Sequence, residues 1–149
     1  MTEVLFYHLT ESTLGEALPS LLEKSIGRGW KAVVQSASEE RRDSLDVALW
    51  TYRDDSFLAH AVDGTEHDPE NPILLTVTTA NGNGAQIRFL VDNAEPPDLS
   101  TYERAVFMFD GHDDDQLQRA RASWKDLRQK GHTVTYWQQT PERRWERKA

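Results

Sequence analysis

The 149-residue chain contains no cysteine and no long, uninterrupted hydrophobic run. Without cysteine, neither a disulfide framework nor a thiolate zinc site can form. The opening residues, MTEVLFYHLTE, carry an acid where a signal peptide would carry Lys or Arg, and no later segment approaches the length of a membrane span. We therefore expect a cytoplasmic protein without membrane contacts.

Basic residues are scarce over most of the chain. Residues 1–115 hold eight Lys and Arg against 22 Asp and Glu, a charge of −14, whereas residues 116–149 hold nine against three, a charge of +6. The resulting net charge of −8 disfavours nucleic acid, whose affinity comes mainly from neutralised phosphates, so we expect no direct contact with it. A positive patch on an acidic body favours a small acidic ligand such as a peptide tail.

The length and composition predict one folded domain over residues 1–149. Apolar residues make up 38% of the chain, which includes five Trp, four Tyr and five Phe. Short apolar runs predict six strands, and spaced apolar residues predict three longer helices. The strands are Val4–Leu9, Trp30–Gln35, Ile73–Thr78, Gln86–Val91, Arg104–Phe109 and Thr133–Gln138; the helices follow the first, second and fifth of them.

Strands separated by helices predict parallel pairing, and therefore an α/β domain of three layers with a mixed, mostly parallel sheet flanked by helices. Three local features refine this prediction. Pro19 makes the first helix either begin near Glu16 or bend, and Ser36 with Glu39 fits a capping box for the second. The NGNG at residues 81–84 favours an antiparallel hairpin.

The connecting segments are predicted to lack regular structure, with one exception. Residues 53–72 read as a long irregular loop, and residues from about 140 onward read as an exposed, charged tail. The exception is a short helix expected after the pair Pro96-Pro97.

Signals of catalysis are weak in this sequence. The turn after the first strand, TESTLGE, lacks the glycines and the lysine of phosphate-binding loops, which argues against nucleotide binding. The five histidines show no metal-binding spacing, and no Ser lies in a nucleophile elbow. We expect no cofactor, no metal and no catalytic residue.

One acidic cluster leaves an enzymatic alternative open. Asp110 ends a strand and is followed by Asp113, Asp114 and Asp115, an arrangement in which Mg²⁺ could support a phosphohydrolase or nuclease. The interpretation we favour is that these acids cap the next helix and complement its dipole.

The helix from about Asp113 to Lys130 carries two stripes. The apolar stripe consists of Leu117, Ala120, Trp124 and Leu127. Arg121, Lys125 and Arg128 follow at i, i+4 and i+7, about 100° around the helix from it. A row of cations beside an indole can hold a carboxylate while an apolar side chain packs on the ring, although it can also be a solvated face over a core stripe.

Two further surfaces are candidates for binding. Trp50 and Phe57 are large hydrophobic residues at the edge of the core, where they either anchor an interface or close the core. The tail could instead bind nucleic acid through its cations and an aromatic residue, a possibility that the acidic body opposes. The tail residues concerned are Arg143, Arg144, Trp145, Arg147 and Lys148.

The order and spacing of several segments resemble the chi subunit of bacterial DNA polymerase III over nearly the whole chain. These segments are FYHL, LLEKSIGRGWKAVV, SEERRDSLDVALWTY, SFLAH, PILLT followed by NGA, FMFDG, ARASWKDLRQKGH and TYWQQ. The resemblance implies a non-catalytic adaptor with a fold similar to mononucleotide-binding proteins but without nucleotide chemistry.

The resemblance also implies partners and sites. Chi-like proteins bind the acidic C-terminal tail of single-stranded DNA-binding protein with a motif R-x-x-[YW]-K, which Arg121, Trp124 and Lys125 match and Arg128 extends. They also bind psi, their link to the clamp loader. Trp50 and Phe57 fall in the matching segment, so the resemblance implies that they contact psi or another clamp-loader component.

Overall fold

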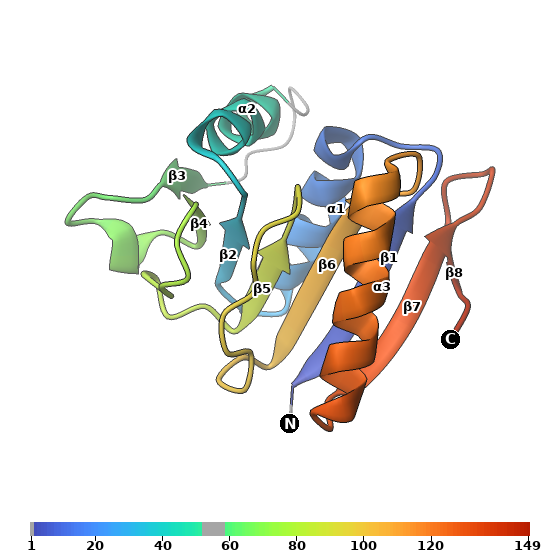
Figure 1. Ribbon diagram of the computed structural model, residues 1–149. Helices are drawn as coiled ribbons and strands as arrows, with labels where there is room; N and C mark the ends of the chain where they lie inside the picture. Colours follow the sequence, from blue (N-terminus) through green and yellow to red (C-terminus); the bar gives the residue numbers. More distant parts are fainter. Residues whose placement is uncertain (1, 52–58) are drawn as a thin grey trace.

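The computed structural model describes residues 2–51 and 59–149, and their eight strands form one sheet between helices (Figure 1). The strand order is β3-β4-β2-β5-β6-β1-β7-β8. The strands are β1 (Glu3–Leu9), β2 (Ala32–Gln35), β3 (His60–Val62), β4 (Ile73–Thr76), β5 (Ile87–Leu90), β6 (Arg104–Asp110), β7 (Thr133–Gln139) and β8 (Trp145–Arg147). All neighbours pair in parallel except β7 and β8.

The helices cover the two faces of this sheet, which confirms the predicted three-layer α/β domain. Helices α1 (Leu14–Gly27) and α2 (Glu39–Trp50) share one apolar core with the sheet, through residues such as Leu22 and Leu49. Helix α3 (Asp114–Gln129) lies on the opposite face, where Ala120 and Leu127 join the second core (Figure 1). No helix among the described residues is long and apolar enough to cross a membrane.

The predicted hairpin at residues 81–84 is wrong. Strands β4 and β5 lie on either side of β2 and run parallel to it, so the chain between them must return along the sheet. The glycines and asparagines therefore form a return loop, and Asn83 fixes it by donating hydrogen bonds from Nδ2 to the carbonyls of Ala32 and Asn71. The antiparallel pair is instead β7–β8, and β8 lies in the segment predicted as an exposed tail.

Helix starts also differ from two predictions. Helix α1 begins at Leu14, because Thr13 and Glu16 form a capping box, and Pro19 lies within it. Helix α2 is capped by Ser38, whose hydroxyl accepts from the amide of Arg41, and not by Ser36.

Two of the connecting segments differ from the prediction. One contains regular structure that was not expected, and the other lacks an expected helix. The predicted loop 53–72 contains β3 and a 3₁₀ turn at Asp68–Glu70 within its described part. The described segment between β5 and β6 contains no helix after Pro97.

Candidate functional site

Helix α3 carries the candidate site, and its sequence accounts for its position. Asp113 caps the helix by accepting hydrogen bonds from the amides of Asp115 and Gln116, and acids in the first turn suit the helix dipole. The apolar stripe faces the sheet as predicted, with Ala120 and Leu127 buried and Trp124 partly buried. The opposite flanks of the helix are therefore free to carry charge.

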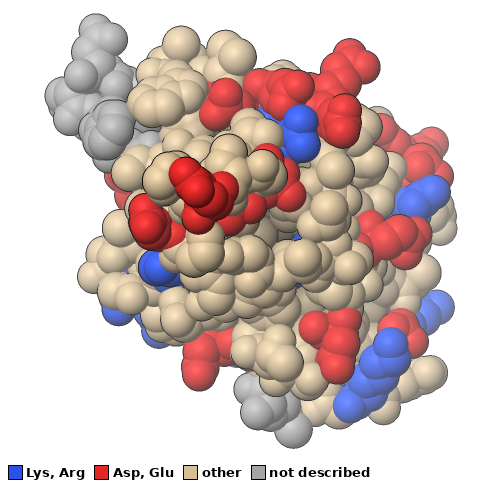
Figure 2. Space-filling model, turned by 90° about the vertical axis from the view of Figure 1, so that its left-hand side faces the viewer, with Lys and Arg blue, Asp and Glu red and all other residues tan. Residues whose placement is uncertain are grey.

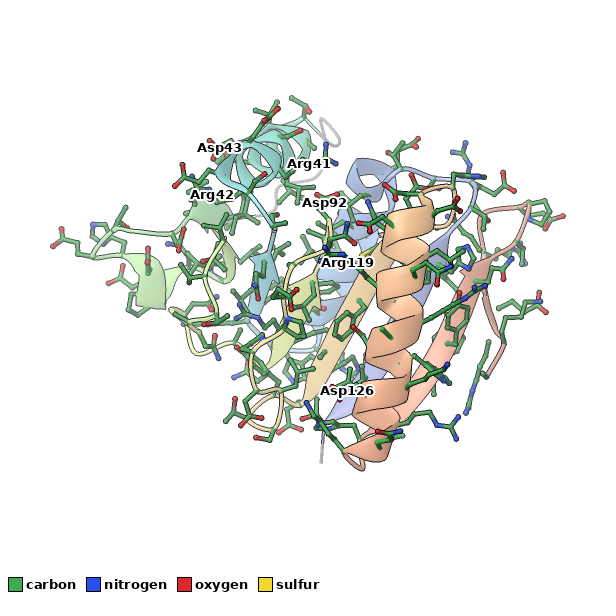
Figure 3. The ribbon with its side chains drawn as sticks, viewed as in Figure 1. Arg41, Arg42, Asp43, Asp92, Arg119 and Asp126 are labelled. Atoms are coloured by element: carbon green, nitrogen blue, oxygen red, sulfur yellow. The ribbon has the colours of Figure 1, made fainter. Side chains whose placement is uncertain are left out.

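The predicted cation row is exposed to solvent. Arg121, Lys125 and Arg128 form no ion pair with any carboxylate in the part of the chain that the structure describes. Other cations of the same helix are engaged: Arg119 lies 3.4 Å from Asp115 and 3.6 Å from Glu95 (Figure 3). The row therefore keeps its charge available for an external anion.

Trp124 is held rigidly beside this row. Its ring meets Phe6 and Tyr136 edge to face, with both centroid distances 5.8 Å. The guanidinium carbon of Arg128 lies 5.6 Å from the indole centroid, within the range of a cation–π contact. Part of the indole remains open to solvent, so it can pack against a ligand without rearranging.

These side chains border a cavity of about 820 Å³, whose lining also includes Gln118, Ala122 and Ala149 but none of the described Asp and Glu side chains. Tyr136 of β7 forms a second aromatic wall, and we did not predict it. The signal was the alternation of β7, because Val134 and Tyr136 face α3 while Trp137 faces the other side of the sheet. Recognising it required knowing that β7 lies beneath α3.

His8 contacts the side chain of Tyr136. Nδ1 of His8 lies 2.7 Å from the hydroxyl oxygen of Tyr136. Burial lowers the pKa of His8 below its ordinary value of 6.5, and His112 and Arg121 lower it further. Burial raises the pKa of Tyr136, which therefore stays protonated at neutral pH. The site accordingly presents a neutral hydroxyl beside its cations.

The acidic cluster does not assemble as a metal site. The carboxylate of Asp110 accepts from the amide of His112, Asp113 is the helix cap, and Asp115 contacts Asn93 and Arg119. Among the described residues, no group of three His, Cys, Asp or Glu side chains is placed to hold a metal ion. The predicted capping role of Asp113 is confirmed.

A family model described as "DNA polymerase III chi subunit, HolC" matches residues 1–135. The chain belongs to this family. The resemblance identified from its sequence is thereby confirmed.

Two curated relatives are similar to this chi-family chain. A probable DNA polymerase III subunit chi of Rickettsia prowazekii is 26% identical over 103 residues, covering 67% of the chain. The DNA polymerase III subunit chi of Pseudomonas aeruginosa is 31% identical over 86 residues, covering 56%. In both cases the match spans 59% of the relative's own length.

The second predicted surface of the chi-family chain is described only in part. Trp50 ends α2 with 54% of its surface exposed, and its ring centroid lies 4.4 Å from that of His60. Phe57 lies outside the described residues. The structure thus leaves Trp50 accessible to a partner.

Two basic residues near the end of the chain form ion pairs with acids of the chain itself. Arg143 lies 3.8 Å from Glu16, and Lys148 lies 3.1 Å from Glu146. Trp145 packs against Tyr7 on the sheet face opposite α3. This engagement of Arg143, Lys148 and Trp145 within the chain disfavours the nucleic-acid interpretation of the tail.

Proposed function

We propose that this chain is a non-catalytic adaptor that binds the acidic C-terminal tail of single-stranded DNA-binding protein in the cavity beside α3. Arg121, Lys125 and Arg128 attract the acidic residues and hold the terminal carboxylate. Trp124 and Tyr136 enclose the terminal aromatic side chain. The observation that carries the proposal is a row of cations that form no ion pair with the described carboxylates, beside a partly open indole in a cavity that none of the described Asp and Glu side chains lines.

The same adaptor joins its ligand to the clamp-loader assembly through a second surface. Trp50 is exposed at the end of α2, and large aromatic residues of this kind commonly anchor interfaces. In this proposal Trp50 and Phe57 contact psi or another clamp-loader component. One chain then tethers the polymerase to protein-coated single strands, where many tails along one strand favour rebinding.

A calorimetric titration tests the tail site directly. The ligand is an acidic peptide ending in Pro-Phe, compared with the same peptide without its final Phe. Charge-assisted hydrogen bonds contribute about 1.5–3 kcal/mol each, so Arg121→Glu should weaken the complete peptide by about tenfold or more at the α3 site. Removing the final Phe should weaken the wild-type interaction as well, because the aromatic slot then stays empty.

The matched control is Trp50→Ala, which changes an exposed aromatic residue away from the cavity and should leave peptide affinity unchanged. Thermal unfolding of both variants checks that each folds, since Arg121 is exposed and makes no ion pair with the described carboxylates. An Arg121→Glu variant that folds and binds the peptide with wild-type affinity would remove the tail-binding assignment.

A further inference from the structure

A second cavity repeats the chemistry of the α3 site on the opposite face of the sheet. It measures about 290 Å³ and lies between α1 and strands β1, β5, β6, β7 and β8. Its lining includes three partly buried aromatic residues, the buried Phe89 and three cations, and none of the described Asp and Glu residues; the partly buried aromatic residues and the cations are Tyr7, Trp137, Trp145, Lys24, Arg28 and Arg104. In a chain with more acids than bases, this exclusion of acids from the lining indicates an anionic ligand.

Strand alternation explains why the two cavities share a strand. Successive side chains of β7 point to opposite faces, so Tyr136 lines the α3 cavity while Trp137 lines the second one. Tyr7 of β1 pairs in register with Trp137, and Trp145 of β8 pairs with Gln139. The three rings are thereby brought to one face of three adjacent strands.

The aromatic residues form a fixed but accessible floor. The ring centroids of Tyr7 and Trp145 are 4.6 Å apart at an angle of 60°, and those of Tyr7 and Trp137 are 6.4 Å apart. All three side chains are only partly buried. An incoming ring can therefore pack against edges and faces that are already in place.

The cations lie at one end of this floor. Lys24 and Arg28 are exposed and form no ion pair with the described carboxylates, and the guanidinium of Arg28 lies 4.2 Å from the Trp30 centroid. Arg104 is partly engaged, since its Nε lies 2.6 Å from a carboxylate oxygen of Glu3. Two of the three charges are thus available to a ligand.

The size and layout of the cavity favour a peptide over a nucleic-acid strand. Small-molecule pockets usually exceed about 300 Å³, so this cavity suits one aromatic side chain rather than several stacked bases. A single-stranded nucleic acid would also need cations along a continuous path, whereas the face of the molecule shown in Figure 2 displays more Asp and Glu than Lys and Arg. An acidic segment with one ring fits both constraints.

We propose that this second cavity binds an acidic peptide segment through an aromatic side chain, so that one chain engages two such segments on opposite faces of its sheet. The identity of this ligand class rests on the proposed function. Two linked contacts to the tails of one oligomeric partner would raise the avidity above that of either contact alone.

The stoichiometry of peptide binding tests the proposal. The titration uses the full chain and the acidic peptide ending in Pro-Phe. Wild-type protein should bind two peptides, and Arg121→Glu should leave one. Adding Lys24→Glu to Arg121→Glu should weaken that remaining site by about fivefold or more, because it reverses an unpaired charge at the cavity. Adding Trp145→Ala in its place should weaken it through loss of the aromatic floor.

Arg144→Glu is the matched control, because it makes the same charge change at an exposed position outside both cavities and should leave the remaining site unchanged. The inference is overturned if the Arg121→Glu variant binds no peptide. It is likewise overturned if neither Lys24→Glu nor Trp145→Ala weakens the peptide binding that remains in that variant. It is also overturned if a labelled oligothymidine binds in a Lys24-dependent way and displaces the peptide. Two sites that are both insensitive to Arg121→Glu would instead contradict the proposed function.

Discussion

At the scale of single residues, the part of the candidate site that lies on one helix could be predicted from the sequence. The residues that other elements contribute could not. Arg121, Lys125 and Arg128 share a face because helical periodicity alone puts them there. Tyr136 and His8 join the same site only through the pairing of β1 with β7. Such contacts depend on the strand order, which local sequence patterns do not encode.

His8 is closely packed between its neighbours in the candidate site. A Cβ added at Gly111 would run into the imidazole of His8, so glycine is required there to leave room for the ring. The imidazole in turn supports the Tyr136 hydroxyl. A histidine that looked isolated in the sequence therefore positions one wall of the candidate site.

The lowered pKa of His8 predicts a pH effect on stability. The unfolded chain protonates this group near pH 6.5, whereas the folded chain does so only at lower pH, so the unfolded state binds more protons between these values. The contribution of His8 to the free energy of unfolding is therefore fully present above about pH 6.5, and it is lost as the pH falls toward the pKa of His8 in the folded state. His8→Gln should therefore flatten the pH dependence of stability.

Urea unfolding at pH 7.0 and pH 5.5 measures this effect. Wild-type protein should lose more stability than His8→Gln over this interval, while other titrating groups contribute equally to both. His67→Gln is the control variant, because it removes an imidazole that is exposed and lies on the connection between β3 and β4. Equal losses in wild type and His8→Gln would show that His8 titrates alike in both states.

At the scale of secondary-structure elements, the sequence predicted most strands and all three long helices. It predicted several of the connections between them wrongly. The turn at residues 81–84 looked like a hairpin because its composition suits a tight turn, yet β2 intervenes between the strands it connects. Arg88 stabilises the return loop by donating hydrogen bonds to the carbonyls of Thr78 and Ala80. The loop is therefore held in place by Arg88, a residue of the strand that follows it.

The cap of α2 gives a prediction that separates two neighbouring serines. Ser38 caps the helix, so Ser38→Ala should cost about 1 kcal/mol of folding free energy. Ser36, chosen from the sequence, is 1% exposed and its hydroxyl has no hydrogen-bond partner among the described residues. Ser36→Ala should be neutral or slightly stabilising, because it removes an unsatisfied buried hydroxyl.

Chemical denaturation of the two single variants compares them under one condition. The larger loss should belong to Ser38→Ala, with an unchanged dependence on denaturant concentration. If Ser36→Ala were the more destabilising variant, the capping box predicted from the sequence would be the true start of α2.

At the scale of the whole molecule, charge is separated rather than uniform. The side that carries α2, β3 and β4 displays more Asp and Glu than Lys and Arg (Figure 2), whereas α3 carries the cation row on another side. An acidic peptide is therefore attracted locally and repelled by the remainder of the protein. Which effect dominates depends on how far each charge acts through the solvent.

Ionic strength separates these two contributions. The Debye length is about 8 Å at 0.15 M salt and about 30 Å at 0.01 M, so distant acids act on the α3 cavity only at low salt. Glu66 and Glu70 are well exposed on the β3–β4 connection, away from α3 (Figure 1). Replacing both with Gln should change peptide affinity less than about twofold at 0.15 M and raise it at 0.01 M.

Arg121→Gln is the comparison within the cavity, and it should weaken peptide binding at both salt concentrations because its contact with the ligand is short. Fluorescence anisotropy of a labelled peptide at the two ionic strengths measures all three proteins. If the Glu66→Gln, Glu70→Gln double variant altered affinity at 0.15 M as strongly as Arg121→Gln, the attraction would arise from the total charge of the molecule. The cation row of α3 would then have no special part in selecting an acidic ligand.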